Sequence, residues 1–406
     1  MRWFLPVLTF AFGVMMMSNF ASAATTEPIH LQLDELARMA QGKRLGILTN
    51  GSARTEAGLH DVDYLMAKDG VKITAFFGPE HGFRGDLADG QKTGDGKDAK
   101  TGIPVYSLYG ERKAPTSEQL KDVDLFVFDI PDVGVRFYTY SWTMTYAMDA
   151  CAAAKIPFVV IDRPNPITGK HVEGAINHED YGLVGRLGHD AKFGVPTRHG
   201  LTMGELATLW NSAWMEPKVD LRVIKIPSWK RDQWLDETGR PFIAPSPNMR
   251  TLTCATVYPG TCIFEGTNLS EGRGTTAPFE LIGAPFVDGD AWAKKLTERG
   301  LPGVKFIPVT FTPDSRRFAG EKCGGVQVVV TDREALHPVA MGVHMLQTVQ
   351  QLYPEQVKIT DYADKLMATP GLRERIKTES VADIVKGWDK DRAAYDALRA
   401  KSLLYP

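Results

Sequence analysis

Residues 125–134 read LFVFDIPDVG, an apolar run that leads directly into two aspartates. Three more runs in the first half of the chain have the same form: LGILTN at 45–50, ITAFFGPEHG at 73–82 and FVVIDRPN at 158–165. Near-continuous Val, Ile, Leu and Phe runs, separated by helical stretches, are typical of buried parallel strands. These runs therefore predict an α/β fold with a mostly parallel sheet.

Polar side chains follow each of these strands at the point where the strand ends. In an open parallel sheet, ligands bind outside the carboxyl ends of the strands. Because these ends meet at one edge of the sheet, we expect the following residues to line one pocket: Asn50, Glu80, His81, Asp129, Asp132, Asp162, Arg163 and Asn165.

The alternation of strands and helices predicts a layered α/β domain over residues 27–250. Its helices are expected near 31–39, 56–68, 116–121, 140–154 and 202–214, with a further strand at 221–226. The last of these helices begins at a capping box formed by Thr202 and Glu205.

A second, smaller α+β domain is expected over residues 251–406. Residues 240–286 are rich in proline and glycine, which mark turns, and we place the domain boundary there. The smaller domain should have strands near 304–311 and 325–331 and helices near 333–352, 360–367 and 380–400.

The composition is that of a globular protein, with 406 residues, 43% hydrophobic and 24% charged, and a net charge of −2. This near-neutral balance argues against nucleic acid as a partner. Residues 1–23 have the form of a secretory signal peptide: a basic start, an apolar run and the small residues Ala21-Ser22-Ala23. An uncleaved membrane anchor is the alternative. We expect a periplasmic or secreted protein with no membrane association after cleavage, and the oligomeric state stays open.

Four cysteines remain, none at zinc-site spacing. Cys254 and Cys262 flank the sequence Tyr-Pro-Gly at 258–260 and can pair across a hairpin there, since an oxidising compartment permits disulfides. Cys151 lies in an Ala-rich helix and is expected to be a small buried apolar residue.

Several motifs carry groups with chemical capability. Glu80 stands at a strand tip beside an aromatic pair, where a partly buried carboxyl group can serve as a general acid; a turn carboxylate is the alternative. Asp129 and Asp132 can place a water, hold a hydroxyl or bind a cation, or form ion pairs that shape the loop. Arg198 and His199 precede a helix start and suit anion binding, or form a solvated pair. The glycine-rich stretch 265–274 and the turn after the first strand, 48–52, lack both nucleotide-binding fingerprints, so we expect no cofactor.

Six motifs in order resemble the NamZ-type exo-β-N-acetylmuramidases, which were long classed as a domain of unknown function. They are PEHGFRG (79–85), PVYSLYG (104–110), FDIPDVGVRFYTY (128–140), DRPNP (162–166), RHGLTMGEL (198–206) and EGTNLSEGRGT (265–275). The typical Gln of the third motif is Pro131 here, and both aspartates are kept. The resemblance covers essentially the whole mature chain. It implies a Rossmann-like domain followed by a smaller domain, with a cleft between them.

The resemblance also implies release of N-acetylmuramic acid from the non-reducing ends of peptidoglycan fragments, so the expected partner is a peptidoglycan-derived glycan. Glycosidic cleavage usually needs two carboxyl groups, about 5 Å apart for retention and about 6.5–9.5 Å apart for inversion. Glu80 is the expected general acid and Asp129 or Asp132 the second group, while a route in which the 2-acetamido group is the nucleophile stays open.

The lactyl carboxylate of the sugar calls for an arginine, and its ring for an aromatic partner. Candidates are Arg84, Arg163, Arg198 and Arg273 for the first, and Tyr138, Tyr140 and Trp142 for the second. The complete set of expected substrate-binding residues is Asn50, His81, Arg84, Arg136, Tyr138, Arg163, Asn165, Arg198, His199, Asn268 and Arg273.

Two other functions remain possible on the sequence alone. One is a non-catalytic periplasmic receptor for sugars or muropeptides, which would also hold its ligand between two α/β domains. The other is a metal-dependent hydrolase built on Asp129, Asp132 and His81, although no His or Cys stands at ligand spacing, and we expect no metal site.

Overall fold

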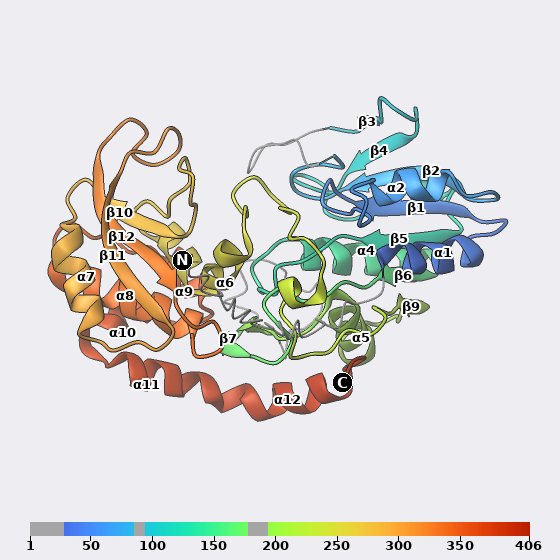
Figure 1. The fold of residues 1–406 in the computed structure, drawn as a ribbon. Helices are drawn as coiled ribbons and strands as arrows, with labels where there is room; N and C mark the ends of the chain where they lie inside the picture. Colours follow the sequence, from blue (N-terminus) through green and yellow to red (C-terminus); the bar gives the residue numbers. More distant parts are fainter. Residues whose placement is uncertain (1–27, 85–93, 178–193) are drawn as a thin grey trace, which may run out of the picture.

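The computed structural model describes residues 28–84, 94–177 and 194–406. The expected signal peptide at 1–23 lies outside the described residues. The chain forms a part built on a seven-stranded sheet, on the right of Figure 1, and a part built on a three-stranded sheet, on the left.

The seven-stranded sheet carries the four strands that the apolar runs predict. Its strands are β1 (Arg44–Thr49), β2 (Lys72–Gly78), β3 (Gly96–Lys97), β4 (Pro104–Ser107), β5 (Leu125–Asp129), β6 (Phe158–Ile161) and β9 (Leu221–Ile224). They lie in the order β3-β4-β2-β1-β5-β6-β9, and all neighbours are parallel except β3 and β4. The chain builds outward from β1 in one direction and then returns to place β5 on its other side. The sheet therefore has its topological switch point between β1 and β5, where such folds bind ligands.

Helices cover both faces of this sheet, as the alternating pattern predicts. They are α1 (Ile29–Met39), α2 (Asp61–Met66), α3 (Ser117–Leu120), α4 (Tyr140–Ala154) and α5 (Met203–Ala213). Along β5, Leu125 and Val127 pack into one core with α1 and α2, whereas Phe126 and Phe128 pack into the other with α4 and α5. Both faces of the strands are buried, which explains their unbroken apolar runs.

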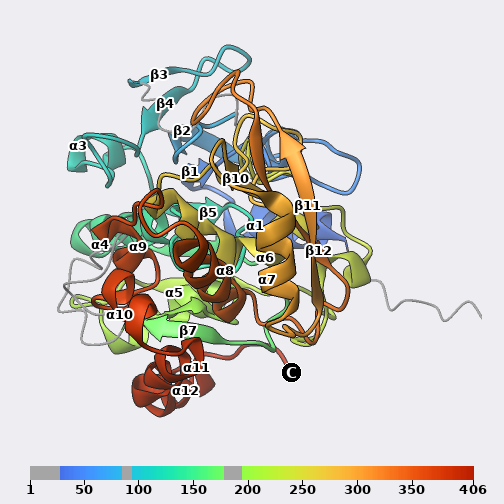
Figure 2. The ribbon, with the colours of Figure 1, turned by 90° about the vertical axis from the view of Figure 1, so that its left-hand side faces the viewer.

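The second part is the smaller α+β unit that the sequence predicts. Its antiparallel sheet has the order β10 (Leu281–Ala284), β12 (Cys323–Val330), β11 (Val304–Phe311). The helices are α6 (Leu252–Thr261), α7 (Gly289–Thr297), α8 (Pro338–Leu352), α9 (Asp361–Leu366), α10 (Leu372–Thr378), α11 (Val381–Lys386) and α12 (Arg392–Ala400). Helix α7 packs on β11 and β12, and α8 packs on α6 and α7 (Figure 2). A two-stranded sheet of β7 (Glu173–Ile176) and β8 (Pro196–Arg198) and the 3-10 turns η2 (Leu235–Thr238), η3 (Cys262–Gly266) and η4 (Gly387–Asp391) complete the described elements.

The hairpin expected around residues 258–260 is wrong, because this segment is helix α6, followed directly by η3. A helix rises about 1.5 Å per residue, so residues eight positions apart lie about 12 Å apart, too far for a disulfide. Cys254 and Cys262 are accordingly free and buried, as are Cys151 and Cys323. The helix expected over 56–68 is also shorter, since residues 51–58 form turns and α2 begins at Asp61.

The chain end returns to the first part. Helices α11 and α12 run along the bottom of Figure 1 from the left-hand part to the right-hand part, where α12 contacts α5. Within the described residues, no helix is both long and apolar enough to cross a membrane.

Candidate active site

Glu80 lies in a tight turn directly after β2. The turn closes through a hydrogen bond from the Gly82 amide to the Pro79 carbonyl, and His81 and Gly82 both have positive φ, at 70° and 76°. This geometry leaves the Glu80 side chain partly exposed, with its Oε2 accepting a hydrogen bond from Thr139 Oγ1 at 2.8 Å. The carboxyl group thus stands at the carboxyl edge of the sheet, in contact with the N-cap residue of α4.

Asp132 lies in the loop that follows β5, across the switch point from Glu80. Its Oδ2 accepts a hydrogen bond from the Gly134 amide at 2.8 Å and lies 3.6 Å from His199 Nε2. Its Oδ1 is buried and has no hydrogen-bond partner among the residues that the structure describes. Gly134 has φ of 77°, and a Cβ there would lie 2.4 Å from Asn165 Oδ1, so this turn requires glycine.

Tyr140 lies near both carboxylates. It is fully buried at the start of α4 and donates a hydrogen bond to the Pro245 carbonyl at 2.5 Å. Burial raises the pKa of Tyr140, and the nearby charges of Glu80 and Asp132 raise it further. Tyr138 packs edge-on against it at 4.9 Å between ring centroids. Glu80 and Asp132 therefore both lie near Tyr140.

Asn50, at the end of β1, completes this edge of the sheet. Its Oδ1 accepts hydrogen bonds from the amide and hydroxyl of Ser52 at 3.0 and 2.6 Å, and its Nδ2 donates to the Pro245 carbonyl at 3.4 Å. The segment around Pro245 therefore lies over the switch point.

A cavity opens beside Asp132 at the same edge. Its walls come from the loops after β1, β5 and β6 and from the segment 235–245, and they include Ser52, Arg54, Arg163, Arg240, Phe242 and Ile243. Arg54 is half-buried and donates to the backbone carbonyls of Gly51 and Gly58. Burial, assisted by the charge of Arg163, lowers the pKa of Arg240 to about 10. The cavity thus combines apolar walls with guanidinium groups, and the sequence analysis did not single out Arg54 or Arg240.

Asp129 is held differently from Asp132. Arg163 donates two hydrogen bonds to Asp129 Oδ1, at 3.0 and 2.5 Å, and also pairs with Asp61. Asp129 is 1% exposed, and burial and the charge of Asp129 raise the pKa of Asp61 well above its usual value. The guanidinium of Arg163 therefore binds two buried carboxyl groups of the fold.

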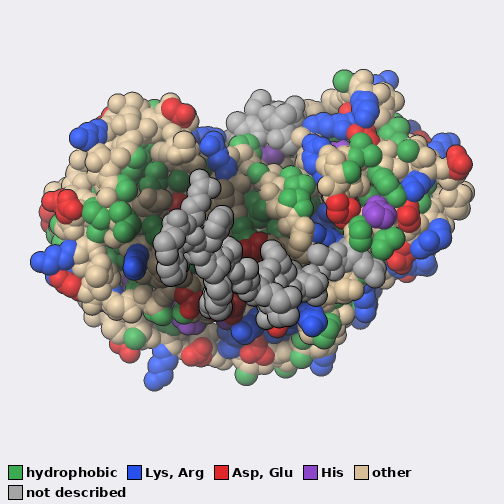
Figure 3. Space-filling model, in the orientation of Figure 1, with side chains coloured by type: hydrophobic (Ala, Val, Ile, Leu, Met, Phe, Trp, Pro, Cys, Tyr) green, Lys and Arg blue, Asp and Glu red, His purple; other side chains and the backbone are tan. Residues whose placement is uncertain are grey.

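The second part of the molecule faces Glu80 with an aromatic residue. Tyr362, on α9, is 37% exposed. Burial raises its pKa, and the charges of Glu265, Cys262 and Glu80 raise it too. Arg273 pairs with Glu265 and Glu271, both at 2.8 Å, and stacks over Phe279. The surface is hollowed between the two parts (Figure 3). No pattern in the sequence singles out Tyr362.

Other expected substrate-binding residues have partners within the fold. Arg84 forms a two-pronged ion pair with Asp98, at 3.0 Å to each oxygen. Arg198 is 2% exposed, donates to the Ile167 carbonyl and stacks over Trp234, and burial lowers its pKa to about 10. Both arginines therefore hold loops.

The expected anion site at the start of α5 is filled by the protein itself. The capping box of Thr202 and Glu205 forms as predicted. Asp162 accepts hydrogen bonds from the Gly204 amide at 2.8 Å and from Thr202 Oγ1 at 2.7 Å. The helix N-terminus thus already binds a carboxylate, and Arg198 does not form an anion site with it.

Three further residues support chain turns or the contact between the two parts. Asn165 donates to the Leu201 carbonyl, and Asn268 bonds to the backbone of Gln356 and Lys358. Arg136 is 1% exposed and donates to the Leu366 carbonyl in α9 at 2.6 Å. Trp142, expected as a sugar platform, is buried in the core.

Asp129, Asp132 and His81, the residues of the metal-dependent alternative, do not come together as a metal site in the part of the chain that the structure describes. Within the described ranges, no three His, Cys, Asp or Glu side chains come together as a metal site. Asp129 is instead bonded to Arg163, and His81 is buried in its turn.

Comparisons with known proteins agree on one family. Residues 45–253 match the family model described as the N-terminal part of exo-β-N-acetylmuramidase NamZ, and residues 256–405 match its C-terminal part. The peptidoglycan β-N-acetylmuramidase NamZ of Bacillus subtilis is 44% identical over 376 residues, which cover 92% of this chain and 89% of the relative.

Two solved structures have the same fold over almost the whole chain. Both are DUF1343 family proteins of Bacteroides fragilis. One has a TM-score of 0.85 at 32% identity, and the match covers 94% of this chain and 100% of that protein. The other has a TM-score of 0.71 at 29% identity, covering 93% and 98%. The chain therefore belongs to the NamZ family of exo-β-N-acetylmuramidases.

Proposed function

We propose that this protein is an exo-acting glycoside hydrolase that releases N-acetylmuramic acid from the non-reducing ends of peptidoglycan fragments. Its family membership supports the reaction. The observation that carries the assignment of the site is that Glu80 and Asp132, which follow two strands of the parallel sheet, both lie near enough to Tyr140 to raise its pKa. Two carboxyl groups around one substrate position are the usual equipment of glycosidases.

Glu80 is the general acid in this proposal. It is partly exposed and points to the edge where a substrate would bind, and its Oε2 is oriented by Thr139 Oγ1. Oε1 is then the atom that delivers a proton to the glycosidic oxygen. A carboxyl group in this role contributes about 10²–10⁴-fold to the rate.

Asp132 is the second group, in preference to Asp129. The lone pairs of Asp129 Oδ1 are taken by Arg163, whereas Asp132 Oδ1 has no partner among the described residues and its side chain lines the cavity. Asp132 can activate a water, attack the sugar, or orient the 2-acetamido group of the substrate if that group is the nucleophile.

The cavity beside Asp132 fits the group that distinguishes muramic acid from glucosamine. A lactyl ether presents a methyl group and a carboxylate, and the cavity offers apolar walls from Phe242 and Ile243 with the guanidinium groups of Arg54 and Arg240. Arginine binds carboxylates through paired hydrogen bonds. Tyr362, which is 37% exposed and lies near enough to Glu80 for that charge to raise its pKa, can offer an aromatic face to a sugar ring.

The experiment is a release assay with matched substrates. The wild-type protein is given a nitrophenyl β-muramide and the corresponding glucosaminide, which lacks only the lactyl group. We expect product from the muramide and much less from the glucosaminide. A receptor would bind muramic acid and release nothing from either, and that result would reject the proposal.

We also propose that the mature protein acts in the periplasm or outside the cell, because residues 1–23 have the form of a signal peptide. Sequencing the amino terminus of the protein purified from its producing cell tests this. A mature terminus at Ala24 is expected, and an intact Met1 would contradict export by cleavage.

A further inference from the structure

We propose that residues 392–406, the C-terminal strap, position His199, and that His199 in turn holds Asp132 in its working orientation. This inference rests on the proposed function, since it takes Asp132 as part of the site. It gives His199 and Tyr395 the role of positioning residues, and it connects the end of the chain to the carboxyl edge of the sheet.

The proton on His199 is placed by its hydrogen bonds. Its Nδ1 accepts a hydrogen bond from the Leu201 amide at 3.2 Å, so the ring proton must reside on Nε2 in the neutral form. Nε2 lies 3.6 Å from Asp132 Oδ2, and the ring is 1% exposed. An N–H group therefore faces the carboxylate across a gap slightly longer than a hydrogen bond. A small shift of the loop would close or widen this gap.

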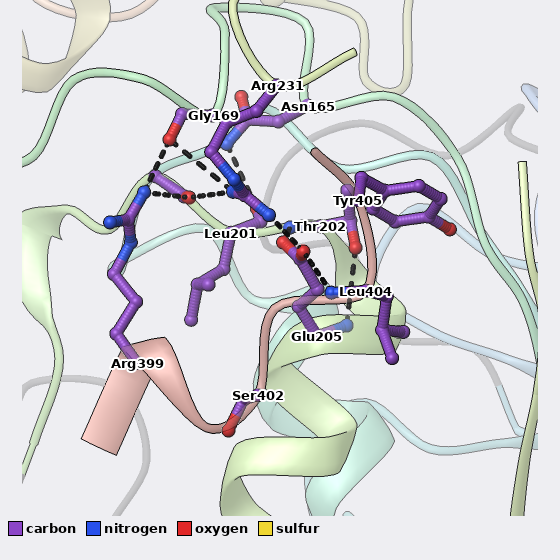
Figure 4. A network of polar contacts seen from close by, with 12 residues as sticks. Asn165, Gly169, Leu201, Thr202, Glu205, Arg231, Arg399, Ser402, Leu404 and Tyr405 are labelled. Carbon is purple, nitrogen blue, oxygen red and sulfur yellow. Dashed lines mark hydrogen bonds and ion pairs between the residues drawn. The ribbon is translucent and has the colours of Figure 1, made fainter. Parts of the chain in front are cut away.

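The strap holds the backbone of the loop that carries His199. Tyr395, on α12, donates its hydroxyl proton to the His199 carbonyl at 2.6 Å. Arg399 donates to the carbonyls of Gly200 and Gly169 at 3.1 and 2.6 Å, and Arg231 also donates to the Gly200 carbonyl at 3.1 Å. Figure 4 shows the two arginines converging on this loop. Two consecutive carbonyls, those of residues 199 and 200, are thus tied to α12.

The end of the strap is anchored on α5. Leu404 donates its amide to Glu205 Oε1 at 2.9 Å (Figure 4). Tyr405 donates its hydroxyl to Asp162 Oδ2 at 2.5 Å. Both acceptors also bind the first turn of α5, which follows the His199 loop directly. The strap therefore fixes the loop from both of its sides.

The first test separates the two nitrogen atoms of His199. Gln places an amide N–H near the position of Nε2, whereas Asn places a carbonyl oxygen near Nδ1 and leaves nothing facing Asp132. We expect His199→Gln to keep kcat within about fivefold of the wild-type value. The kcat of His199→Asn should be about tenfold lower than that of His199→Gln, since one hydrogen bond is worth roughly five- to tenfold in rate. Equal losses in both variants, or a greater loss in His199→Gln, would contradict the inference.

The second test removes the contact between the strap and the loop. Tyr395→Phe deletes only the hydroxyl that binds the His199 carbonyl. Tyr353→Phe is the matched control, because its hydroxyl accepts a hydrogen bond from the Asp288 amide in the second part of the molecule. We expect a similar small loss of thermal stability in both variants, but a decrease in kcat of about fivefold, with KM changed less than about twofold, only in Tyr395→Phe.

A purely structural strap would give the same kcat in Tyr395→Phe and Tyr353→Phe, and this outcome would overturn the inference. Failure of the proposed function looks different, since the wild-type protein itself would then release no muramic acid in the same assay.

Discussion

Asp129 and Asp132 are three positions apart in the chain but have different chemical surroundings. Asp129 ends β5 and is neutralised by Arg163, whereas Asp132 lies past Pro131, where the loop turns it toward Tyr140 and the cavity. A buried carboxylate that is bonded to an arginine stabilises the fold, and its removal leaves an unpaired charge. Asp129 therefore stabilises the fold, and the functional role that we propose belongs to Asp132.

Asp132→Asn should lower kcat by about 10²–10⁴-fold, the range for a positioned carboxyl group, and leave the melting temperature nearly unchanged. Asp124→Asn is the control, because Asp124 precedes the same strand at its opposite end and pairs with Arg44. Steady-state kinetics on a muramide measure both variants. Turnover of Asp132→Asn close to that of Asp124→Asn would remove Asp132 from the site.

The positions of single residues were predictable from the sequence only where the residues directly follow a predicted strand. Glu80 and Asp132 follow strands whose apolar runs are unmistakable, so their common edge could be predicted. The partners of Arg198 and Arg84 could not, because Ile167 and Asp98 reach them through loops whose path no local pattern encodes. Tyr362 was missed for the same reason, since an exposed tyrosine on a short helix looks like any surface residue.

At the scale of elements, the first turn of α5 binds a buried carboxyl group, that of Asp162. Asp162 is fully buried, and burial, opposed by hydrogen bonds from Tyr405, Thr202 and Gly204, raises its pKa from 3.8 to about 6. The folded state therefore binds a proton more tightly than the unfolded state does. The contribution of Asp162 to stability is greatest below the unfolded pKa and is lost as the pH rises through the folded one.

The free energy of unfolding of the wild type, relative to Asp162→Asn, should accordingly fall by about 2 kcal/mol between about pH 4 and about pH 7. Denaturant titrations of both proteins at these pH values measure the difference. If the free energy of unfolding of the wild type, relative to that of Asp162→Asn, stays constant or rises with pH, the pKa of Asp162 is not raised.

Helices α6 and α8 approach each other closely at two glycines. A Cβ on Gly260 would lie 1.8 Å from the Pro338 carbonyl oxygen, and one on Gly342 would lie 2.3 Å from the Gly260 oxygen. Composition alone made 240–286 look like loop, because Pro259 and Gly260 are turn residues in most contexts. Here they lie in a helix whose glycine serves close packing, so tertiary contact outweighed local propensity.

Gly260→Ala should therefore destabilise the protein by about 3 kcal/mol, the upper end of the cost of overpacking. Gly387→Ala is the control, because a Cβ there meets only Arg375 Nη2 at 3.9 Å. Its stability should be unchanged or higher by up to about 1 kcal/mol. Thermal unfolding compares the two, and equal melting temperatures would show that α6 and α8 are not in close contact.

At the scale of the whole molecule, the proposed site draws on both parts of the chain. In this proposal the first part supplies Glu80 and Asp132 from one sheet edge, and the second supplies Tyr362 and the strap. The mostly parallel strands and the smaller α+β part were predictable, because each depends on patterns within one segment. The return of the strap to α5 was not, since it depends on contacts between residues that are about 200 positions apart.

The most direct test is the turnover of Glu80→Gln on two muramides that differ only in leaving group. A glucosamine leaving group needs a proton from the general acid, whereas nitrophenolate leaves without one. Glu118→Gln, an exposed carboxyl group paired with Lys121, is the control. We predict that Glu80→Gln loses about 10²–10⁴-fold in kcat on the disaccharide, much less on the nitrophenyl substrate, and still binds muramic acid. Near-normal turnover of the disaccharide by Glu80→Gln would contradict the account.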